Sequence, residues 1–318
     1  MMYISPKRLS AGSRVAIVAP ASPFKTDELV AGLDIIKSVG LEPVLGPNVR
    51  NMRTSDIHSA PVMDRADELM WAFTDPDIDG VITVTGGLGS GGTLPYLDFG
   101  KIRESRRTII GISDISALNN GILAGAGLIT VNGQYPSIRL DEGNRIREAD
   151  SESLKFTLDL LMSEERWGER PFDLNQYLPR TISAGRASGP IVGGNLDTFC
   201  TLLGTPFMPD VEGAILFCED VHKSGEAIAR LLLHLQLAGV LDAVSGIVVG
   251  EFVDVPKKLE DREPAIEDVL EEYLSGGVPC VYGYSFSHGP MTIPIPIGAQ
   301  CEMDADTGRV DFDLTMAS

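Results

Sequence analysis

Residues 107–126 read RTIIGISDISALNNGILAGA, a short apolar run followed by a longer one. The first run, Arg107–Ile112, is rich in β-branched residues and predicts a buried strand, and the second, Asp114–Ala126, predicts a helix. Residues 80–92, GVITVTGGLGSGG, likewise begin as a strand, at Gly80–Thr85, and continue into a glycine run. Strands that lead directly into turns and helices predict βαβ units of a parallel sheet, and fully apolar strands predict helices on both of its faces.

The same alternation extends over the first 140 residues. Two further apolar runs predict strands at Ser13–Pro20 and Leu41–Leu45. Helical spacing of apolar residues predicts helices at Thr26–Val39 and Pro61–Phe73. We therefore expect a parallel α/β sheet in the first part of the chain.

The pattern changes after residue 140. Residues 141–180 are rich in charge and contain one helical stretch, Ser151–Leu161, followed by an irregular part around Trp167–Pro179. From Ala187 onward, a helix is expected after Gly193-Gly194-Asn195, and the next expected elements are strands 214–218 and 246–250 and helices 226–238 and 264–274. The tail, residues 278–314, has short β-type runs broken by Pro and Gly, without regular alternation of strand and helix.

Composition limits the function classes. The chain has 318 residues, 43% of them hydrophobic, which suits two globular domains with large cores. Its formal net charge of −19 disfavours general binding to nucleic acids or anionic membranes. No apolar run approaches the roughly 18 residues of a membrane span, and the short run Val15–Val18 predicts a strand rather than a signal peptide.

Cysteine usage suggests a reducing compartment. The four cysteines, Cys200, Cys218, Cys280 and Cys301, form no CxxC pair, and three of them lie among apolar residues. We expect buried free thiols and a cytoplasmic protein.

A serine stands between the expected strand and helix of the opening stretch. In Gly111-Ile112-Ser113-Asp114-Ile115 the serine would stand at the edge of the sheet, and the first amides of the helix would face the same space. This arrangement is typical of a nucleophile elbow, although the full GxSxG pattern is absent because Ile115 replaces the second glycine. The alternative is an ordinary helix N-cap formed by Ser113.

The glycine run 86–92 has three interpretations. It contains neither GxGxxG nor GK[ST], so a phosphate cradle has no motif support. Its backbone amides could bind an oxyanion that develops next to the neighbouring strand, or the run could be a flexible turn. Because ligands bind at the carboxyl ends of strands in open α/β sheets, we favour a ligand site.

Acid and base candidates lie in the second half. Phe217-Cys218-Glu219-Asp220 ends an apolar strand with two carboxylates, which could also be a solvated strand end. The four histidines are His58, His222, His234 and His288. His234 lies in an apolar helix and is expected to be packed, whereas His288 lies in a loop among helix breakers, where catalytic residues concentrate. No HxxxH, HExxH or Cys/His cluster exists, so we expect neither a metal site nor a cofactor.

The motifs occur in an order that resembles one known family. They run along nearly the whole chain: RVAIVAPAS (14–22), residues 65–75 before the glycine run, LPYLDF (94–99), IGISDISAL (110–118), GGNL (193–196) with GT (204–205), ILFCED (215–220), HGP (288–290) and IPIG (295–298). The chain resembles the serine LD-carboxypeptidases, or muramoyl-tetrapeptide carboxypeptidases, including their microcin-immunity branch.

This resemblance implies a set of catalytic residues. The family's Ser–Glu–His trio falls on Ser113, Glu219 and His288, and its oxyanion donors fall on the backbone N–H groups of Gly87 and Asp114. A hydroxyl nucleophile needs an adjacent base, and the base needs an orienting carboxylate, so the three residue types suit one another. The resemblance further implies a small peptide or aminoacyl-nucleotide substrate, a role in peptidoglycan recycling and a homodimer.

The expected architecture has two domains. Residues 1–140 form a flavodoxin-like, parallel-sheet α/β domain that carries the nucleophile, and residues 141–186 form a connecting segment. Residues 187–318 form a smaller α+β domain that carries Glu219 and His288, so the active site should lie between the domains.

Departures from the family pattern affect the expected substrate. Thr85 precedes the glycine pair where an Arg is usual, Asn132-Gly133 replaces His-Gly, and Ser287 replaces the Gly before the histidine. Release of the terminal D-alanine of murein tetrapeptide and hydrolysis of an aminoacyl-adenylate amide both remain open.

The remaining candidates concern substrate binding, and the remaining alternatives concern binding without turnover. Trp167 could stack on a nucleobase, or it could anchor the linker. Gly86 and Asn195 are further candidates for substrate binding. A ligand-binding module that uses only the glycine run, and a family member whose trio no longer acts, are the non-catalytic alternatives.

Overall fold

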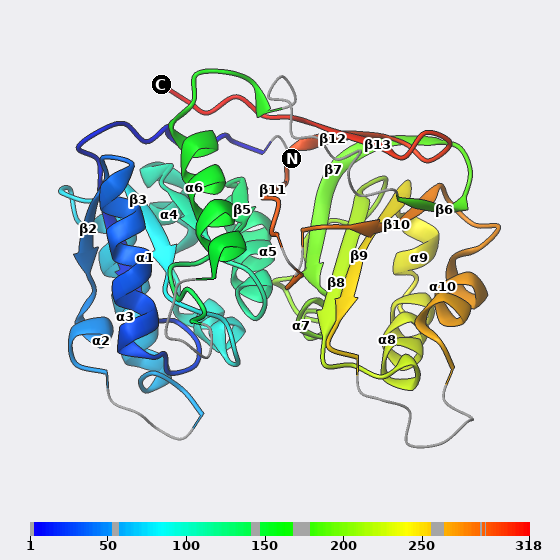
Figure 1. Cartoon of the computed structure of the whole chain (residues 1–318), viewed down its shortest axis with the longest axis horizontal. Helices are drawn as coiled ribbons and strands as arrows, with labels where there is room; N and C mark the ends of the chain where they lie inside the picture. Colours follow the sequence, from blue (N-terminus) through cyan, green and yellow to red (C-terminus); the bar gives the residue numbers. More distant parts are fainter. Residues whose placement is uncertain are drawn as a thin grey trace.

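The computed structural model describes residues 3–52, 57–140, 147–167, 179–255, 264–286, 288–289 and 291–318. Two β-sheets, each with its own helices, lie side by side, and the C-terminal end of the chain returns to the first half (Figure 1). Among the described residues, no helix combines the length and the apolar character needed to cross a membrane.

The first sheet has the strand order β11-β5-β4-β3-β1-β2. Its first five strands in the chain are parallel: β1 (Arg14–Val18), β2 (Glu42–Leu45), β3 (Gly80–Thr83), β4 (Thr108–Ile110) and β5 (Thr130–Asn132). The order 2-1-3-4-5 is that of flavodoxin-like sheets. The sixth strand, β11 (Ile295–Ile297), comes from the far end of the chain and pairs antiparallel with β5. The expectation of a purely parallel first sheet is therefore wrong at this edge.

Helices cover both faces of this sheet, as the apolar strands predict. They are α1 (Thr26–Ser38), α2 (Pro47–Arg50), α3 (Val62–Thr74), α4 (Phe99–Ser105), α5 (Ile115–Ala126) and α6 (Glu148–Met162), with a 3-10 helix, η1, at Ser90–Tyr96. Alternate residues of β1 point to opposite faces: Val15 and Ile17 pack with α1 and α6, whereas Ala16 and Val18 pack with α3 and α5. The expected strands and helices of the first half are thus confirmed, with shifts of a few residues at their ends.

The second sheet has the strand order β13-β12-β7-β8-β9-β10-β6. Its strands are β6 (Arg180–Ser183), β7 (Arg186–Asn195), β8 (Ile215–Val221), β9 (Gly246–Val253), β10 (Cys280–Tyr284), β12 (Gln300–Asp304) and β13 (Arg309–Asp313). The helices between them are α7 (Leu196–Cys200), α8 (Gly225–Leu237), α9 (Val240–Ala243) and α10 (Ile266–Leu274).

The α+β prediction for the second half needs correction. Strands β7, β8, β9 and β10 are parallel neighbours connected through helices, so the centre of this sheet is α/β. Antiparallel pairing is confined to β12, β13 and β6 at the two edges. The sequence concealed β7 because this strand is rich in glycine: a Cβ on Gly193 would lie 1.9 Å from the carbonyl oxygen of Phe217 on β8. At such positions only glycine fits, which leaves Ile191 and Val192 as the β-branched residues by which this strand could be recognised.

The predicted domain ranges remain predictions, but α6 and β6, both inside the predicted connecting segment 141–186, pack with the first and second halves, respectively. Strand β11 lies within residues 187–318 but belongs to the first sheet. The chain end also returns there, because the N–H of Ala317 donates to the carbonyl of Pro6. Most of the expected irregular stretch after Trp167 falls on residues 168–178, outside the described residues. All four cysteines are buried and free, as expected.

Candidate active site

Ser113 occupies the corner between β4 and α5 in a strained conformation. Its φ is +68°, a region that residues other than glycine rarely adopt. Such strain persists only where the surrounding structure enforces it, and it concentrates at functional sites. Helix α5 has Asp114, not Ser113, as its N-cap residue. The ordinary N-cap alternative for Ser113 is therefore wrong.

The glycine run lies directly against this serine. A Cβ on Gly86 would lie 2.7 Å from Cβ and 3.1 Å from Oγ of Ser113. Gly87 and Gly89 have φ values of +106° and +102°, which glycine adopts without strain. Ser113 packs so closely against position 86 that only glycine fits there, and a larger residue would displace the hydroxyl.

Asp114 connects the serine corner to the glycine run. Its carboxylate accepts hydrogen bonds from the N–H groups of Gly89 (2.9 Å) and Ser90 (2.7 Å). The Ser90 hydroxyl in turn donates to the Asp114 carbonyl oxygen at 2.6 Å. These three bonds tie the run to the serine corner and argue against the flexible-turn interpretation.

Two backbone amides in this corner have no internal partner. Within the described part of the chain, neither the N–H of Gly87 nor that of Asp114 donates a hydrogen bond. Backbone donors in protein interiors are normally paired. These two amides, one directly after Ser113 and one directly after Gly86, are therefore available to a ligand oxygen.

A buried carboxylate and a histidine pair at the end of β8. Nδ1 of His288 lies 2.9 Å from Oε2 of Glu219, and the two side chains are 15% and 1% exposed. Burial is the largest single influence on the pKa of His288 and lowers it. The charge and hydrogen bond of Glu219, together with the charge of Asp220, raise it, and the net pKa is above the usual imidazole value. Glu219 and Asp220 are both buried, so the solvated-strand-end interpretation is wrong.

Asn195 joins this pair to the serine corner. Its Nδ2 donates to Asp220 (3.1 Å) and to Glu219 (3.4 Å), and its backbone N–H donates to the Ser116 hydroxyl (3.0 Å). Ser116 lies in the first turn of α5, and its N–H donates to the carbonyl of Ser113. A continuous chain of hydrogen bonds thus runs from Ser113 in the first half to His288 in the second.

The other candidates have different places. Trp167 is only 5% exposed and lies in the core beside α1 and α6, so its ring offers no face for stacking on a ligand. His234, expected to be packed, is exposed on α8, and His222 is exposed after β8. His58 lies beside Gly89, where a Cβ would come within 2.4 Å of its Nε2. Ser287 falls outside the described residues.

Cationic side chains near the acid–base pair are themselves paired. The charge of Arg139 lowers the pKa of His288. The Arg139 guanidinium forms two hydrogen bonds with the buried Asp150, at 2.9 and 3.0 Å. Lys223, which interacts electrostatically with Asp220, forms an ion pair with Asp197. Among the described residues, no group of three or more His, Cys, Asp or Glu side chains could hold a metal ion.

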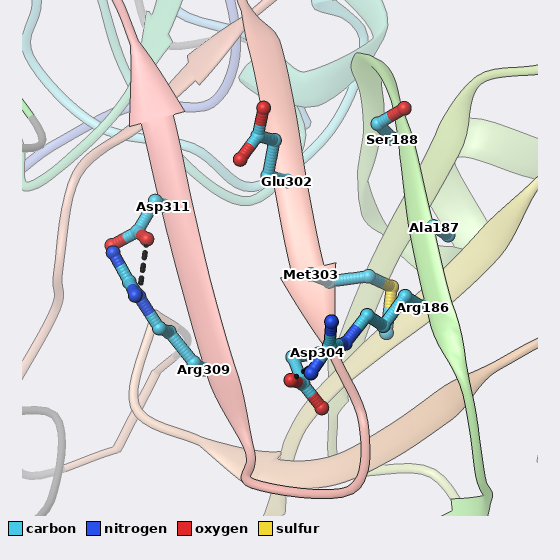
Figure 2. A pocket seen from close by; sticks show the side chains of 8 residues that line it. All are labelled: Arg186, Ala187, Ser188, Glu302, Met303, Asp304, Arg309 and Asp311. Atoms are coloured by element: carbon cyan, nitrogen blue, oxygen red, sulfur yellow. Dashed lines mark hydrogen bonds and ion pairs between the residues drawn. The ribbon is translucent and has the colours of Figure 1, made fainter.

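A separate surface pocket lies on the outer strands of the second sheet. Figure 2 shows its side chains on β7, β12 and β13, where Arg186 pairs with Asp304 at 3.0 Å and Arg309 pairs with Asp311. It contains none of the predicted site residues, and its two arginines pair with two of its three carboxylates.

Sequence reasoning missed several residues of the site. Ser22, Arg65 and Ser116 lie within stretches that carry the family resemblance, but nothing local distinguishes them or Asn120, because their contacts span long sequence separations. Asn195 was noticed as a binding candidate, but its polar atoms all serve the protein's own hydrogen bonds.

Known proteins share both halves of this chain. Residues 15–133 match the LD-carboxypeptidase N-terminal domain and residues 188–303 match the LD-carboxypeptidase C-terminal domain. A probable murein peptide carboxypeptidase of Bacillus subtilis is 32% identical over 302 residues, covering 94% of this chain and 91% of the relative. The murein tetrapeptide carboxypeptidase of Pseudomonas aeruginosa is 31% identical over 308 residues, covering 93% and 94%.

A solved structure has the same fold. The microcin C7 self-immunity protein MccF, in complex with aspartyl sulfamoyl adenosine, superposes with a TM-score of 0.83 at 25% identity, covering 99% of this chain and 100% of the other. Fold and relatives together define a two-domain α/β serine peptidase. The chain belongs to the LD-carboxypeptidase family, Peptidase S66, which includes the MccF microcin-immunity branch.

Proposed function

We propose that this protein is an LD-carboxypeptidase that releases the terminal D-alanine from murein tetrapeptide. The scissile amide joins an L-centre, such as that of lysine or diaminopimelate, to D-alanine. The proposal is supported by the two relatives named for murein peptides, each about one-third identical to this chain over nearly its whole length. The observation that carries it is the buried Glu219–His288 pair, linked through Asn195 and Ser116 to the strained Ser113.

The proposed reaction begins with Ser113. Its Oγ attacks the carbonyl carbon of the scissile amide, and His288 accepts the hydroxyl proton as the C–O bond forms. The carbonyl oxygen becomes an oxyanion and accepts hydrogen bonds from the unpaired N–H groups of Gly87 and Asp114. His288 then protonates the amide nitrogen, the C–N bond breaks, and D-alanine leaves.

Water completes the cycle. His288 accepts a proton from water, the resulting hydroxide attacks the ester carbonyl on Ser113, and the Ser113 oxygen leaves with the proton from His288. Glu219 accepts the hydrogen bond from Nδ1–H of His288, which leaves Nε2 of the ring for the proton transfers. The negative charge of Glu219 also stabilises the imidazolium that forms in both steps.

Stereochemical selection follows from rigidity. Ser113 is held at positive φ and the glycine run is held by Asp114, so only one face of a substrate carbonyl can meet both groups. Inverting the terminal residue exchanges its methyl group with its hydrogen or carboxylate, which breaks contacts or leaves a charge unpaired.

The test offers purified protein an L,D-tetrapeptide and its L,L isomer, and measures the released alanine by chiral mass spectrometry. Release of D-alanine without L-alanine is the expected result. Cleavage of neither peptide would contradict the proposed substrate.

A second candidate is hydrolysis of an aminoacyl-adenylate amide. The fold match to MccF, solved with aspartyl sulfamoyl adenosine, favours it, as do the departures at Thr85 and Asn132. The burial of Trp167 argues against it, because no ring face of this tryptophan is free to stack on a base. Cleavage of an aminoacyl sulfamoyl adenosine or adenylate, with no D-alanine from tetrapeptide, would replace the first proposal by this one.

Covalent labelling separates both enzymatic proposals from a binding module or an inactive family member. A fluorophosphonate should modify Ser113, which peptide mass spectrometry would locate.

We further infer a cytoplasmic homodimer with domain ranges 1–140 and 187–318 joined by residues 141–186. Sedimentation measures the assembly state, and limited proteolysis tests the boundaries.

A further inference from the structure

A buried arginine next to the glycine run has no part in the chemistry proposed above. Arg65 projects from the first turn of α3 and is only 3% exposed. Its Nη1 donates to the carbonyl oxygens of Pro20 (2.6 Å) and Gly89 (2.7 Å), and its Nε donates to that of Ala60 (3.0 Å). A single guanidinium thus joins three separate loops of the first domain.

The burial of this cation needs an explanation. Removing a charge from water is costly unless hydrogen bonds and opposite charge compensate it. The three carbonyls supply the hydrogen bonds, and the Asp114 carboxylate attracts the guanidinium electrostatically. A guanidinium with several donors in a fixed plane can meet these carbonyls at once, and the ammonium of lysine cannot reproduce that geometry.

The loops that Arg65 joins enclose the unpaired amide of Gly87. On one side, Ser22 follows Pro20 closely, and its hydroxyl accepts the N–H of Leu88 at 3.0 Å while its own N–H donates to the Gly86 carbonyl. On the other side, Gly89 donates to Asp114. The chain neighbours of Gly87 therefore each form a hydrogen bond, and Arg65 donates to carbonyls in both of the segments that hold them.

We propose that Arg65 is a positioning residue for the oxyanion hole: by tying Pro20 to Gly89, it keeps the N–H of Gly87 directed at the carbonyl that Ser113 attacks. This inference rests on the proposed function, because it presumes that Gly87 binds the oxyanion. The contribution of an oxyanion donor depends on its being oriented before the reaction, so a loosened loop should slow the chemical step and leave substrate binding nearly intact.

The chain offers a matched control. Arg107 is a half-buried arginine at the start of β4, and it donates to two backbone carbonyls, those of Ala72 (2.8 Å) and Asp75 (2.5 Å). These carbonyls belong to the end of α3, away from the glycine run. Arg107→Ala removes similar bonds from the same domain without touching the loops around Gly87.

The experiment compares Arg65→Lys, Arg65→Ala and Arg107→Ala with the wild-type protein. Two rates are measured: D-alanine release, as kcat and KM, and the second-order rate of phosphonylation of Ser113 by a fluorophosphonate, which also builds negative charge on oxygen. Both rates are expressed per folded molecule, with the folded fraction taken from circular dichroism. Arg65→Lys guards against simple misfolding of the alanine variant.

We expect both Arg65 variants to lose about 10- to 1,000-fold in kcat and in phosphonylation rate, with KM changed by less than about threefold. Guanidinium or methylguanidinium at non-denaturing concentration should partly restore Arg65→Ala, and Arg107→Ala should keep wild-type rates. Wild-type rates in both Arg65 variants, an equal loss in Arg107→Ala, or absence of guanidinium rescue would each overturn the positioning role.

Failure of the proposed function gives a different result. If the wild-type protein is neither labelled at Ser113 nor active on the tetrapeptide, the proposed function is wrong and the role of Arg65 falls with it. If the wild-type protein is labelled and Arg65 variants react as fast, only the positioning role is wrong.

Discussion

Replacing Glu219 by glutamine tests the acid–base pair most directly. The substitution keeps the size of the side chain but removes its charge, next to an imidazole nitrogen 2.9 Å away. Glu219 is 1% exposed, so solvent cannot supply a replacement for the lost charge. Asn195 still contacts the other oxygen position, so the side chain should remain in place.

The variant should lose activity and shift its pH dependence. Loss of the orienting carboxylate from a comparable serine–histidine site costs on the order of 10⁴-fold in kcat, and we expect about 10²–10⁴-fold here. Because Glu219 raises the pKa of His288, its neutralisation lowers that pKa. The general base must be neutral, so the acidic midpoint of kcat/KM should move to lower pH in the variant.

The Glu219–His288 pair also contributes to the free energy of unfolding, and this contribution depends on pH. The pKa of His288 in the folded protein is above its ordinary value of 6.5, so protonation of His288 stabilises the fold. This stabilisation is fully present below the pKa of the unfolded chain, and it is lost as the pH rises through the pKa of the folded protein. Glu219→Gln should therefore be destabilised most at mildly acidic pH, by about 1.5–3 kcal/mol, the usual worth of a hydrogen bond to a charged group. The difference from wild type should shrink at alkaline pH.

The assays are D-alanine release across pH and urea unfolding on either side of the imidazole pKa. Asp220→Asn is the matched control: it neutralises a neighbouring buried carboxylate that accepts from Asn195 and does not contact His288. It should shift the kinetic midpoint less than Glu219→Gln does. An unchanged or higher midpoint in Glu219→Gln would refute the assignment of His288 as the base oriented by Glu219.

Four further outcomes are expected. Ser113→Ala and His288→Ala should each abolish turnover of the tetrapeptide, and the double variant should be little worse, because the members of such a set act as a unit; clearly additive losses would argue against a shared mechanism. Gly87→Val should lower kcat about 10²–10³-fold, whereas Gly204→Val, at another positive φ (+75°) with open space around it, should cost stability but leave kcat per folded molecule unchanged. Asn120→Leu removes the two hydrogen bonds between the Asn120 side chain and the backbone of Gly193. It should lower the free energy of unfolding, measured by urea denaturation, by about 1–3 kcal/mol for each backbone group left unpaired. EDTA should leave D-alanine release unchanged, and a loss restored by added metal would contradict a metal-free reaction.

Several features could be predicted from the sequence because they depend on neighbours in the chain. The apolar runs predicted β1 and β3, and helical spacing predicted α1 and α5, since burial on a strand or helix follows the local period of apolar residues. The position of Ser113 between a strand and a helix followed in the same way. Its proposed pairing with Glu219 and His288 came from resemblance to a family, and no local pattern implied it.

Only the tertiary structure decided how distant segments meet. Strand β11 completes the first sheet from the end of the chain, and Asn195 reaches Ser116 across 79 residues. Arg65 finds its carbonyl partners from Pro20 to Gly89, and Trp167 is buried in a core instead of facing a ligand. The local preference for helix or strand depends on the nearest few side chains. These contacts depend instead on the packing of the two sheets, which decides which strand ends lie close together. The sequence by itself therefore determined most elements of the first half and the residue types proposed for the chemistry, and the packing of the two halves determined how distant segments are arranged.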